Sequence, residues 1–334
     1  MKEGFYMCKI RIGILGYGNL GKGVELAIKQ NDDMELIGVF TRRDPKTVNT
    51  VYSPVYHIDD AKNMTDKIDV MILCSGSATD LPVQGPEFAK LFNTVDSFDT
   101  HAKIPEYFKN IDKVSTESKH VSIICVGWDP GLFSIQRSLF ESVLPDGNSY
   151  YFYGRGLSQG HSDAVRRVPG VKNAVQYTVP YDEAVEKVRN GENPQFKSVR
   201  EKMWRECFVV AEDSADKNFI EKTIKEMPNY FDEYNTVVHF ISEEEFKKNH
   251  SSMPHGGFVL RSGLTGPNNT TKQIAEFSLK LESNPEFTAS VLIAYARANY
   301  RLYKKSDFGC KTVFDIAPSL LSTKSDEELR KELL

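Results

Sequence analysis

The chain has 334 residues, of which 40% are hydrophobic and 26% are charged, and it carries a formal net charge of −4. This length allows a sizeable buried core and predicts two domains. The slightly acidic balance excludes nucleic acid and anionic membrane as main partners, because both attract a basic surface.

We expect neither export nor membrane insertion. The first nine residues, MKEGFYMCK, lack the apolar core of a signal peptide, and no apolar run approaches the roughly 20 residues that span a bilayer. The cysteines are odd in number and widely spaced, with no CxxC pair: Cys8, Cys74, Cys125, Cys207 and Cys310. This pattern predicts reduced thiols in a cytoplasmic protein, and we predict no metal site.

Short apolar runs alternate with helical patterns up to Gly127. We predict strands at 9–15, 35–40, 69–74, 93–96 and 121–126, with a helix at 20–29 after the first strand. Such alternation is typical of a parallel sheet with helices on both faces. The sequence therefore predicts an α/β, Rossmann-type doubly wound domain over residues 1–127.

The strands become alternating and half-exposed after Gly127. They are predicted at 149–155, 174–180, 205–212, 236–242, 256–263 and 275–282, with charged helices at 182–190, 216–226 and 243–248. This pattern predicts an α+β domain over residues 128–299, with an open, mostly antiparallel sheet and helices on one side. A dimer partner could cover the other side. A long helix is predicted from Pro285, and residues 300–334 are expected to pack back on the first domain.

The run GYGNLG (16–21) fits the pattern G-x-G-x-x-G, and it follows a predicted strand and opens a predicted helix. Gly16 permits a tight turn, Gly18 lets backbone amides approach a pyrophosphate, and Gly21 lets the helix and strand pack closely. The N-terminus of the helix favours a phosphate. Together these features predict a dinucleotide site.

The second strand ends in Thr41-Arg42-Arg43. About twenty residues after the glycine turn, many NAD-binding proteins have an Asp or Glu that binds the ribose hydroxyls. A guanidinium at that place can instead bind a 2′-phosphate through paired hydrogen bonds and stack on adenine. We therefore predict NADP rather than NAD. Which of the two arginines makes the closer phosphate contact stays open.

Later strands also end in residues suited to bind the nicotinamide half of a cofactor and an amine substrate. The segment CSGSATD (74–80) is small enough for close approach to the nicotinamide-side ribose, although it can equally be a plain turn with Ser77 or Thr79 as the helix N-cap. Asp96 and Asp99 stand at the end of one further strand and Asp129 at the end of another, and carboxylates there would hold an ammonium group, as in an amino acid dehydrogenase. Asp129 can also be read as a turn former before Pro130.

Seven motifs resemble the meso-diaminopimelate dehydrogenase family, in the right order and over nearly the whole chain. They are GYGNLG, FTRRD, GSATD, TVDSFDTH, GWDPGLFS, GLSQGHSDAVRRVPGVKNAVQYT and MPHGG. The resemblance implies reversible, NADP-dependent oxidative deamination at the D-centre of meso-2,6-diaminopimelate. The products are L-2-amino-6-oxopimelate (a precursor of tetrahydrodipicolinate), ammonia and NADPH. It further implies a homodimer and a role in lysine biosynthesis.

The resemblance also implies the site residues. The implied substrate contacts are Asp99, Trp128, Asp129, Tyr153, Gln159, Gly160, Thr178, Arg205, His255 and Asn284. The implied cofactor contacts are Gly16, Tyr17, Gly18, Asn19, Leu20, Thr41, Arg42, Arg43, Cys74, Ser75, Gly76, Ser77, Ser97, Phe98, Asp99, Val126, Gly127, Trp128, Asp129 and Pro130.

The chemistry of these residue types agrees with a substrate that has two carboxylates and two ammonium groups. Arg205, Thr178 and His255 would donate to the distal carboxylate. Asp129 is the first candidate for relaying a proton from the reacting ammonium and Asp99 the second, and the identity of the base stays open.

Each substrate-side residue also has a plainer reading. Arg205 could be a surface charge on an edge strand, Asn284 before Pro285 a helix start, and His255 a turn residue. Tyr153 stands where the family often has a tryptophan, which bears on tolerance for other D-amino acids.

Three other functions were weighed. Related sugar oxidoreductases carry a Glu-Lys-Pro motif, and dihydrodipicolinate reductases a paired-histidine and lysine motif; neither occurs at the corresponding place here. A non-catalytic NADP-binding sensor would have no need of the candidate substrate residues.

Overall fold

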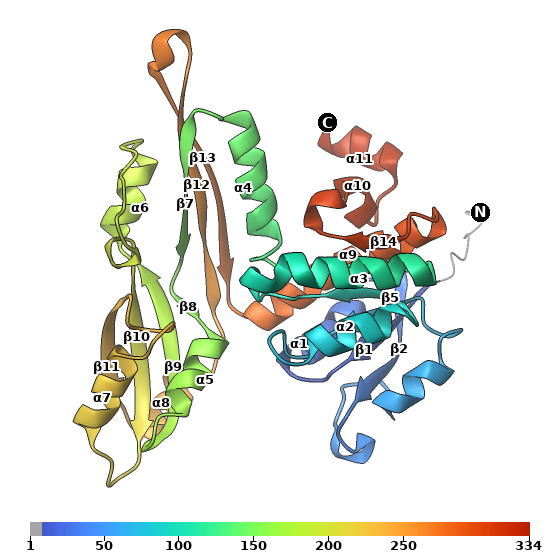
Figure 1. Cartoon of the computed structure of the whole chain (residues 1–334), viewed down its shortest axis with the longest axis horizontal. Helices are drawn as coiled ribbons and strands as arrows, with labels where there is room; N and C mark the ends of the chain where they lie inside the picture. The colour runs from blue at the N-terminus through green and yellow to red at the C-terminus, as the bar shows by residue number, and fades with distance from the viewer. Residues whose placement is uncertain (1–8) are drawn as a thin grey trace. The chain divides into compact units, whose positions relative to one another are not determined.

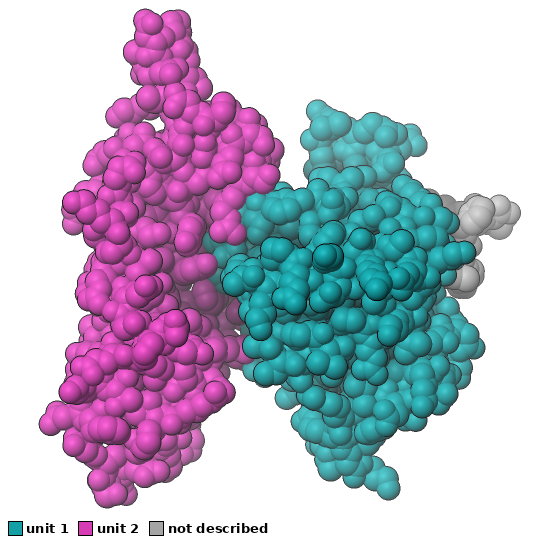
Figure 2. All heavy atoms as spheres, viewed as in Figure 1, with its two compact units in different colours: residues 1–135, 285–334 teal, residues 136–284 magenta. Residues whose placement is uncertain are grey.

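A computed structural model of the chain describes residues 9–334, so Cys8 and nearly all of the N-terminal segment lie outside the described residues. The chain forms two compact units (Figure 2), the first extending to Ile135 and including Pro285–Leu334, the second spanning Gln136–Asn284. The sequence analysis placed these boundaries at 127/128 and 299/300.

The first unit contains a sheet of seven parallel strands. Their order is β14 (Gly309–Lys311), β6 (Val121–Ile123), β5 (Asn93–Asp96), β4 (Val70–Leu73), β1 (Ile10–Leu15), β2 (Met34–Thr41) and β3 (Val55–His57). Connections leave β1 toward β2 and β4 toward β5, so the order reverses between β1 and β4. Ligands of doubly wound sheets bind at such a switch point, outside the carboxyl ends of the strands.

Helices cover both faces of this sheet (Figure 1), which confirms the predicted Rossmann-type fold. Apolar residues of α1 (Asn19–Ile28) and α9 (Asn284–Lys304) share one core with the sheet, and those of α2 (Leu81–Ala89) and α3 (Ile104–Ser118) share the other. Strands β1, β4, β5 and β6 are almost entirely buried, as expected for a sheet covered twice. Short helices complete the unit: η1 (Pro45–Thr47), η2 (Ile58–Asn63), η3 (His101–Lys103), η6 (Val313–Asp315), α10 (Pro318–Leu321) and α11 (Asp326–Leu333).

Helix α9 is fixed to the sheet by buried polar side chains. Asn299 is fully buried, and its Nδ2 donates to the carbonyls of Thr94 and Val121, both at 2.9 Å. Arg297 is 3% exposed and binds both carboxylate oxygens of Asp33, at 2.6 and 2.8 Å. The same guanidinium donates to Asn31 Oδ1 and to the carbonyl of Leu321, so it also holds the C-terminal end of α10.

The second unit contains two sheets. One has the order β11 (Asn235–Phe240), β10 (Met203–Ala211), β9 (Val171–Pro180), β8 (Gly156–Leu157); the other has the order β13 (Thr271–Leu281), β12 (His255–Thr265), β7 (Gly147–Tyr153). All pairs except β10–β11 are antiparallel. The helices are α4 (Leu132–Val143, which begins in the first unit), α5 (Gln159–Arg166), α6 (Asp182–Arg189), η4 (Val199–Glu201), α7 (Lys217–Lys225), α8 (Glu243–Asn249) and η5 (Pro267–Asn269).

The mostly antiparallel character of the second unit is confirmed, but its strands divide between two sheets, where one was predicted. The chain passes from β7 to β8 at Gly154, whose amide bonds to Gly256 of β12. Helices also lie on both faces of the four-stranded sheet: α5 and α7 share one core with it, and α8 shares another. Alternation of polar and apolar residues identifies strands but not their partners, because partner choice is decided by tertiary packing.

Within residues 9–334, none of the helices has the length and apolarity that spanning a bilayer requires. In the same range, no group of three or more His, Cys, Asp or Glu side chains could hold a metal ion. Cys74, Cys125, Cys207 and Cys310 are free thiols.

The Arg297 contacts predict a stability effect. In Arg297→Met, the carboxylate of Asp33 loses its partner, and we expect the free energy of unfolding to fall by about 2–3 kcal/mol. Urea denaturation at neutral pH measures this. Lys304→Met removes an exposed cation from the same helix and should change it by less than about 0.5 kcal/mol. Equal stability of Arg297→Met and the unsubstituted protein would show that this ion pair does not hold α9.

Candidate active site

The loops after β1, β2 and β4 enclose a pocket of about 300 Å³ in the first unit. Many of the predicted cofactor residues line it: Gly16, Tyr17, Gly18, Thr41, Arg42, Arg43, Cys74 and Ser75. The lining is completed by Leu15, Phe40, Ile58, Asp80 and Gln84. The pocket thus lies at the carboxyl ends of strands on both sides of the switch point.

The three glycines of the turn after β1 have different geometries. Gly16 has φ +91°, and a Cβ there would lie 3.0 Å from Ser75 Oγ. A Cβ on Gly21 would lie 2.3 Å from the carbonyl oxygen of Gly16, so only glycine lets α1 approach the turn this closely. A Cβ on Gly18 would meet nothing within 4 Å, and Gly18 has no side chain to cap the first amides of α1. The helix N-terminus is therefore open to a phosphate from outside.

The two arginines after β2 are held differently. Arg43 Nη2 donates to the carbonyl of Tyr17 at 2.9 Å, which ties Arg43 to the glycine turn. Arg42 Nη2 lies 2.8 Å from Asp80 Oδ1, and the Arg42 side chain is 63% exposed. Asp80 also accepts from the amide of Gly76. An ion pair this exposed is worth about 0–1 kcal/mol, so an incoming phosphate can displace Asp80 from Arg42.

The buried carboxylate of Glu25 binds Tyr17, which lines this pocket. Glu25 is fully buried in α1 and accepts from the amides of Val51, Tyr52 and Ser53 at 2.9–3.1 Å and from the hydroxyl of Tyr17. Burial alone would raise the pKa of Glu25, but the hydrogen bonds outweigh it and hold that pKa below its ordinary value. Tyr17 therefore lines the pocket with its hydroxyl turned away to Glu25.

Asp99 belongs to the loop after β5, which is tied to the loop after β4. Asp99 is exposed, and its amide donates to Ser77 Oγ at 2.9 Å. Phe98 and Val126 are buried, so they can offer a ligand only backbone groups. Ser97 lies between Asp96 and Phe98 in this loop.

The loop after β6 carries Trp128 and Asp129. Trp128 is 7% exposed and packs edge-on against Phe133, with ring centroids 5.1 Å apart. The Asp129–Pro130 peptide is cis, and Asp129 is half-buried. A Cβ on Gly131 would lie 1.9 Å from the carbonyl oxygen of Gly127, so the turn closes on itself. Both candidate carboxylates thus stand at neighbouring strand ends of one sheet.

Arg205 is a buried cation in the four-stranded sheet of the second unit. It lies on β10 between β9 and β11, is 6% exposed, and its Nη1 donates to Thr178 Oγ1 at 3.1 Å. Its guanidinium lies 3.8 Å from the centroid of the Tyr234 ring. The reading of Arg205 as an edge-strand surface charge is therefore wrong.

The Arg205 guanidinium still has a donor that could bind a ligand. Its Nε is buried without a hydrogen-bond partner, and within residues 9–334 no carboxylate forms an ion pair with it. Burial lowers the pKa of Arg205, yet a guanidinium keeps its charge at neutral pH. A buried cation with a free donor is suited to bind a carboxylate.

His255 and Thr178 meet around Gly156. Thr178 pairs with Gly156 across β9 and β8, and a Cβ on Gly156 would lie 2.4 Å from His255 Nδ1. The rings of His255 and Tyr153 meet edge-on with centroids 6.2 Å apart. The structure thus brings four predicted substrate residues together: Tyr153, Thr178, Arg205 and His255.

Gln159 and Asn284 are both linked to Met253. Gln159 Nε2 lies 3.3 Å from Met253 Sδ, and the amide of Asn284 donates to the Met253 carbonyl at 2.9 Å. Asn284 also begins α9, so its plainer reading as a helix start holds as well. Gly160 follows Gln159 in α5, and a Cβ there would meet nothing within 4 Å.

The sequence analysis missed several residues of these sites. Asp80 stood inside a quoted motif but was assigned no role. Asp96 was expected beside Asp99 as a carboxylate for an ammonium group, whereas it is buried. Tyr234, which contacts Arg205, belongs to none of the quoted motifs, and Gln176, which donates to Thr178, stood inside a quoted motif without a role. Glu25 reads in sequence like any charge on the solvent face of a helix, and only its burial reveals its role.

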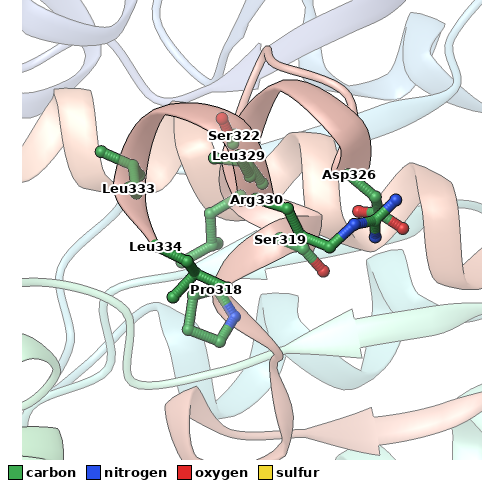
Figure 3. Close-up of a pocket in the computed structure, with 9 residues that line it drawn as sticks. Pro318, Ser319, Ser322, Asp326, Leu329, Arg330, Leu333 and Leu334 are labelled. Carbon is green, nitrogen blue, oxygen red and sulfur yellow. The ribbon is translucent and has the colours of Figure 1, made fainter.

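A separate pocket of about 620 Å³ lies between α10 and α11 (Figure 3). Its lining residues all come from the C-terminal segment, Pro318, Leu333 and Leu334 among them. No predicted site residue lines it, so volume alone does not identify the site.

Comparisons with known proteins agree with this geometry. Residues 127–283 match the family model for the diaminopimelic acid dehydrogenase C-terminal domain. The chain is 66% identical to the meso-diaminopimelate D-dehydrogenase of Ureibacillus thermosphaericus over 329 residues, which cover 98% of this chain and 100% of that protein. The chain belongs to the meso-diaminopimelate D-dehydrogenase family.

Solved structures of related proteins support the same assignment. The C. glutamicum diaminopimelate dehydrogenase in complex with diaminopimelate matches with a TM-score of 0.91 and 44% identity, covering 98% of this chain and 100% of that one. An engineered D-amino acid dehydrogenase bound to NADP⁺ matches with a TM-score of 0.86 and 42% identity, with the same coverage. The resemblance stated from the motifs is thereby confirmed, and the sugar-oxidoreductase and reductase readings are wrong.

The Glu25 contacts predict a pH-dependent stability. Glu25→Gln places an amide N–H against backbone donors, and we expect a loss of about 2 kcal/mol at pH 7. Because the folded-state pKa of Glu25 lies below its unfolded value, this contribution is present above about pH 4.3 and shrinks as the pH falls through the folded pKa. Urea denaturation between pH 3 and 7 measures it.

Glu35→Gln makes the same substitution at an exposed position of β2 and serves as the control. A deficit for Glu25→Gln that grows toward low pH would contradict the account of Glu25.

Proposed function

We propose that this chain catalyses the reversible, NADP-dependent oxidative deamination of the D-centre of meso-2,6-diaminopimelate, in lysine biosynthesis. The products are L-2-amino-6-oxopimelate, ammonia and NADPH. The observation that carries the proposal is the buried Arg205, which has no carboxylate partner within residues 9–334, in a chain 66% identical to a meso-diaminopimelate D-dehydrogenase.

The distal end of the substrate binds in the second unit. Arg205 donates to the distal carboxylate from Nε and the guanidinium fork, and the Thr178 hydroxyl beside it fixes the orientation. His255, across Gly156 from Thr178, supplies a further donor. Because the two ends of the meso isomer differ only in handedness, selection of the D-centre requires at least three fixed contacts, with both ends of the substrate held at once.

The reacting end binds in the first unit. Asp99 and Asp129 accept hydrogen bonds from the D-centre ammonium, and one of them takes a proton from it, Asp129 being the first candidate. When bound, NADP accepts the hydride that leaves the D-carbon. The resulting imine adds water and releases ammonia, which leaves the oxo group. Trp128, almost fully buried, shields the reacting carbon from bulk water.

The loops after β1 and β2 suit NADP. The open N-terminus of α1 at Gly18 receives the pyrophosphate, and Arg42 and Arg43 receive the 2′-phosphate. A carboxylate also lines this pocket, since Asp80 pairs with Arg42. Arg42 therefore has to exchange Asp80 for the phosphate, whereas Arg43 is already fixed to the glycine turn.

We further propose that the protein acts as a homodimer. Strand β13 is an edge strand of its sheet, and its Ile274 is 38% exposed. Such an edge is commonly covered by a partner. Oxidation of other D-amino acids is a second candidate activity, favoured by Tyr153 beside His255, where the family often has a tryptophan.

A spectrophotometric assay tests the proposed function. With NADP, we expect turnover of the meso isomer, weaker turnover of the DD isomer, whose distal end has the wrong handedness, and none of the LL isomer. Arg205→Met should raise KM for the meso isomer about 100-fold, because it removes the charged partner of the distal carboxylate. Arg167→Met removes an exposed arginine of the same unit and should leave KM unchanged. Intact cofactor binding without turnover of the meso isomer would contradict the proposal.

The arginines after β2 predict the cofactor preference. In Arg42→Ala with Arg43→Ala, we expect Kd for NADP to rise by roughly tens of fold, since about 1.5–3 kcal/mol of charge-assisted bonding is lost, while Kd for NAD changes little. Quenching of intrinsic fluorescence measures both. Asp80→Asn frees Arg42 and should shift the preference the opposite way, toward NADP. An unchanged ratio of the two Kd values in the double variant would mean that the arginines do not select the cofactor.

A further inference from the structure

The carboxylate of Asp96, the last residue of β5, lies beneath the loops that carry Asp99 and Asp129. Asp96 is 1% exposed. Its Oδ1 accepts from the amides of Phe98 at 2.9 Å and Cys125 at 3.3 Å. Its Oδ2 accepts from the Tyr107 hydroxyl at 2.7 Å, and within residues 9–334 no cation pairs with it. One buried side chain therefore bonds to both loops.

These hydrogen bonds connect the segments after β5 and β6 at the point where the two strands no longer pair. Pairing of β5 with β6 stops at Val95 and Ile123. Beyond that point Asp96 continues to hold the chain after β6, because its carboxylate binds the amide of Cys125 and its carbonyl binds the amide of Val126 at 2.9 Å.

Cys125 adopts a backbone conformation that needs such support. Its φ is +59°, in the left-handed region that non-glycine residues enter at a cost of about 1 kcal/mol or more. A residue stays there only where its surroundings fix it. The direction in which Gly127, Trp128 and Asp129 leave the sheet thus depends on the contacts of Asp96.

The same carboxylate organises the loop after β5. The Phe98 ring stacks on the Tyr107 ring with centroids 4.1 Å apart, and Tyr107 is the residue whose hydroxyl binds Asp96. Phe98 is thus held at both its amide and its ring. The next residue, Asp99, is directed outward, where its amide reaches Ser77 Oγ.

We propose that Asp96 is a positioning residue, which fixes the spacing of Asp99 and Asp129 through hydrogen bonds to Phe98 and Cys125, with Tyr107 as its support. The roles of Asp99 and Asp129 rest on the proposed function. Asp96 itself is buried and does not line the pocket after β1, β2 and β4, so we infer that it acts through the two loops.

The test compares Asp96→Ala, Asp96→Asn and Tyr107→Phe with the unsubstituted full-length protein. In Asp96→Ala, kcat for meso-diaminopimelate should fall about 30-fold or more, because a misplacement near 1 Å can cost about 100-fold in rate. Kd for NADP should rise by less than kcat falls, since the pocket after β1, β2 and β4 is lined from other strand ends and only part of the implied cofactor contacts belongs to the two loops. Asp96→Asn should recover kcat to within about fivefold, because its oxygen still accepts from both amides and its N–H can donate to the Tyr107 hydroxyl.

Tyr107→Phe removes only the hydrogen bond from the Tyr107 hydroxyl to Asp96 and should lower kcat about 3- to 10-fold. Three results would overturn the proposal: kcat unchanged in Asp96→Ala, equal loss of kcat in Asp96→Ala and Asp96→Asn with the fold intact, or a loss of NADP affinity in Asp96→Ala as large as its loss of kcat. If Asp96→Ala does not fold, full activity of Tyr107→Phe or a 30-fold loss in Asp96→Asn overturns it.

A second readout separates this proposal from the proposed function. In a Trp204→Phe background, Trp128 is the only tryptophan, because the chain has two. The emission maximum of Trp128 should shift in Asp96→Ala and should have its original wavelength in Asp96→Asn. Both results are expected whether or not the protein turns over diaminopimelate. An emission spectrum that is identical in all three proteins would overturn the positioning role.

Discussion

The site depends on one constraint, that the strands of a parallel sheet all end at the same edge. Two loops of the first unit start from a backbone bond to a neighbouring strand: the amide of Gly16 binds the Phe40 carbonyl, and the amide of Cys74 binds the Leu15 carbonyl. The glycine turn, the arginine pair and the small-residue loop meet there because of strand order rather than closeness in sequence. Asp96 connects the loops after β5 and β6 in the same way, beyond the last hydrogen-bonded pair of these two strands.

The buried arginines differ in how completely their donors are hydrogen-bonded. Arg297 binds Asp33, Asn31 and a carbonyl, and Arg261 donates to the carbonyls of Leu144 and Pro145 and to Ser149 Oγ. Arg205 is as deeply buried, but its Nε has no partner. A buried charge that is incompletely bonded is costly, and such costs are retained where a ligand completes the bonding. Asp96 has a cost of the same kind, since burial raises its pKa to about 6 despite three donors.

Much of the fold followed from sequence pattern, and the details of the site did not. Apolar runs located β1, β2, β4, β5 and β6 to within a residue or a few, because a doubly covered sheet leaves continuous buried segments. The division of the second unit into two sheets depends on which strands pair, which single-strand patterns do not encode. The motif TRR predicted the arginine pair, but Asp80, about forty residues later, joins it only through the fold. Glu25 and Asp96 have ordinary sequence surroundings, and their roles come from burial.

The central claim is that hydride leaves the D-carbon of meso-diaminopimelate for NADP while the other end of the substrate is held by Arg205. It is tested most directly with meso-diaminopimelate carrying deuterium only at the D-centre, followed by mass spectrometry of the cofactor and the amino acid product. The account predicts one deuterium in the reduced NADP and none in L-2-amino-6-oxopimelate. Unlabelled reduced cofactor together with deuterium retained in the amino acid product would contradict it.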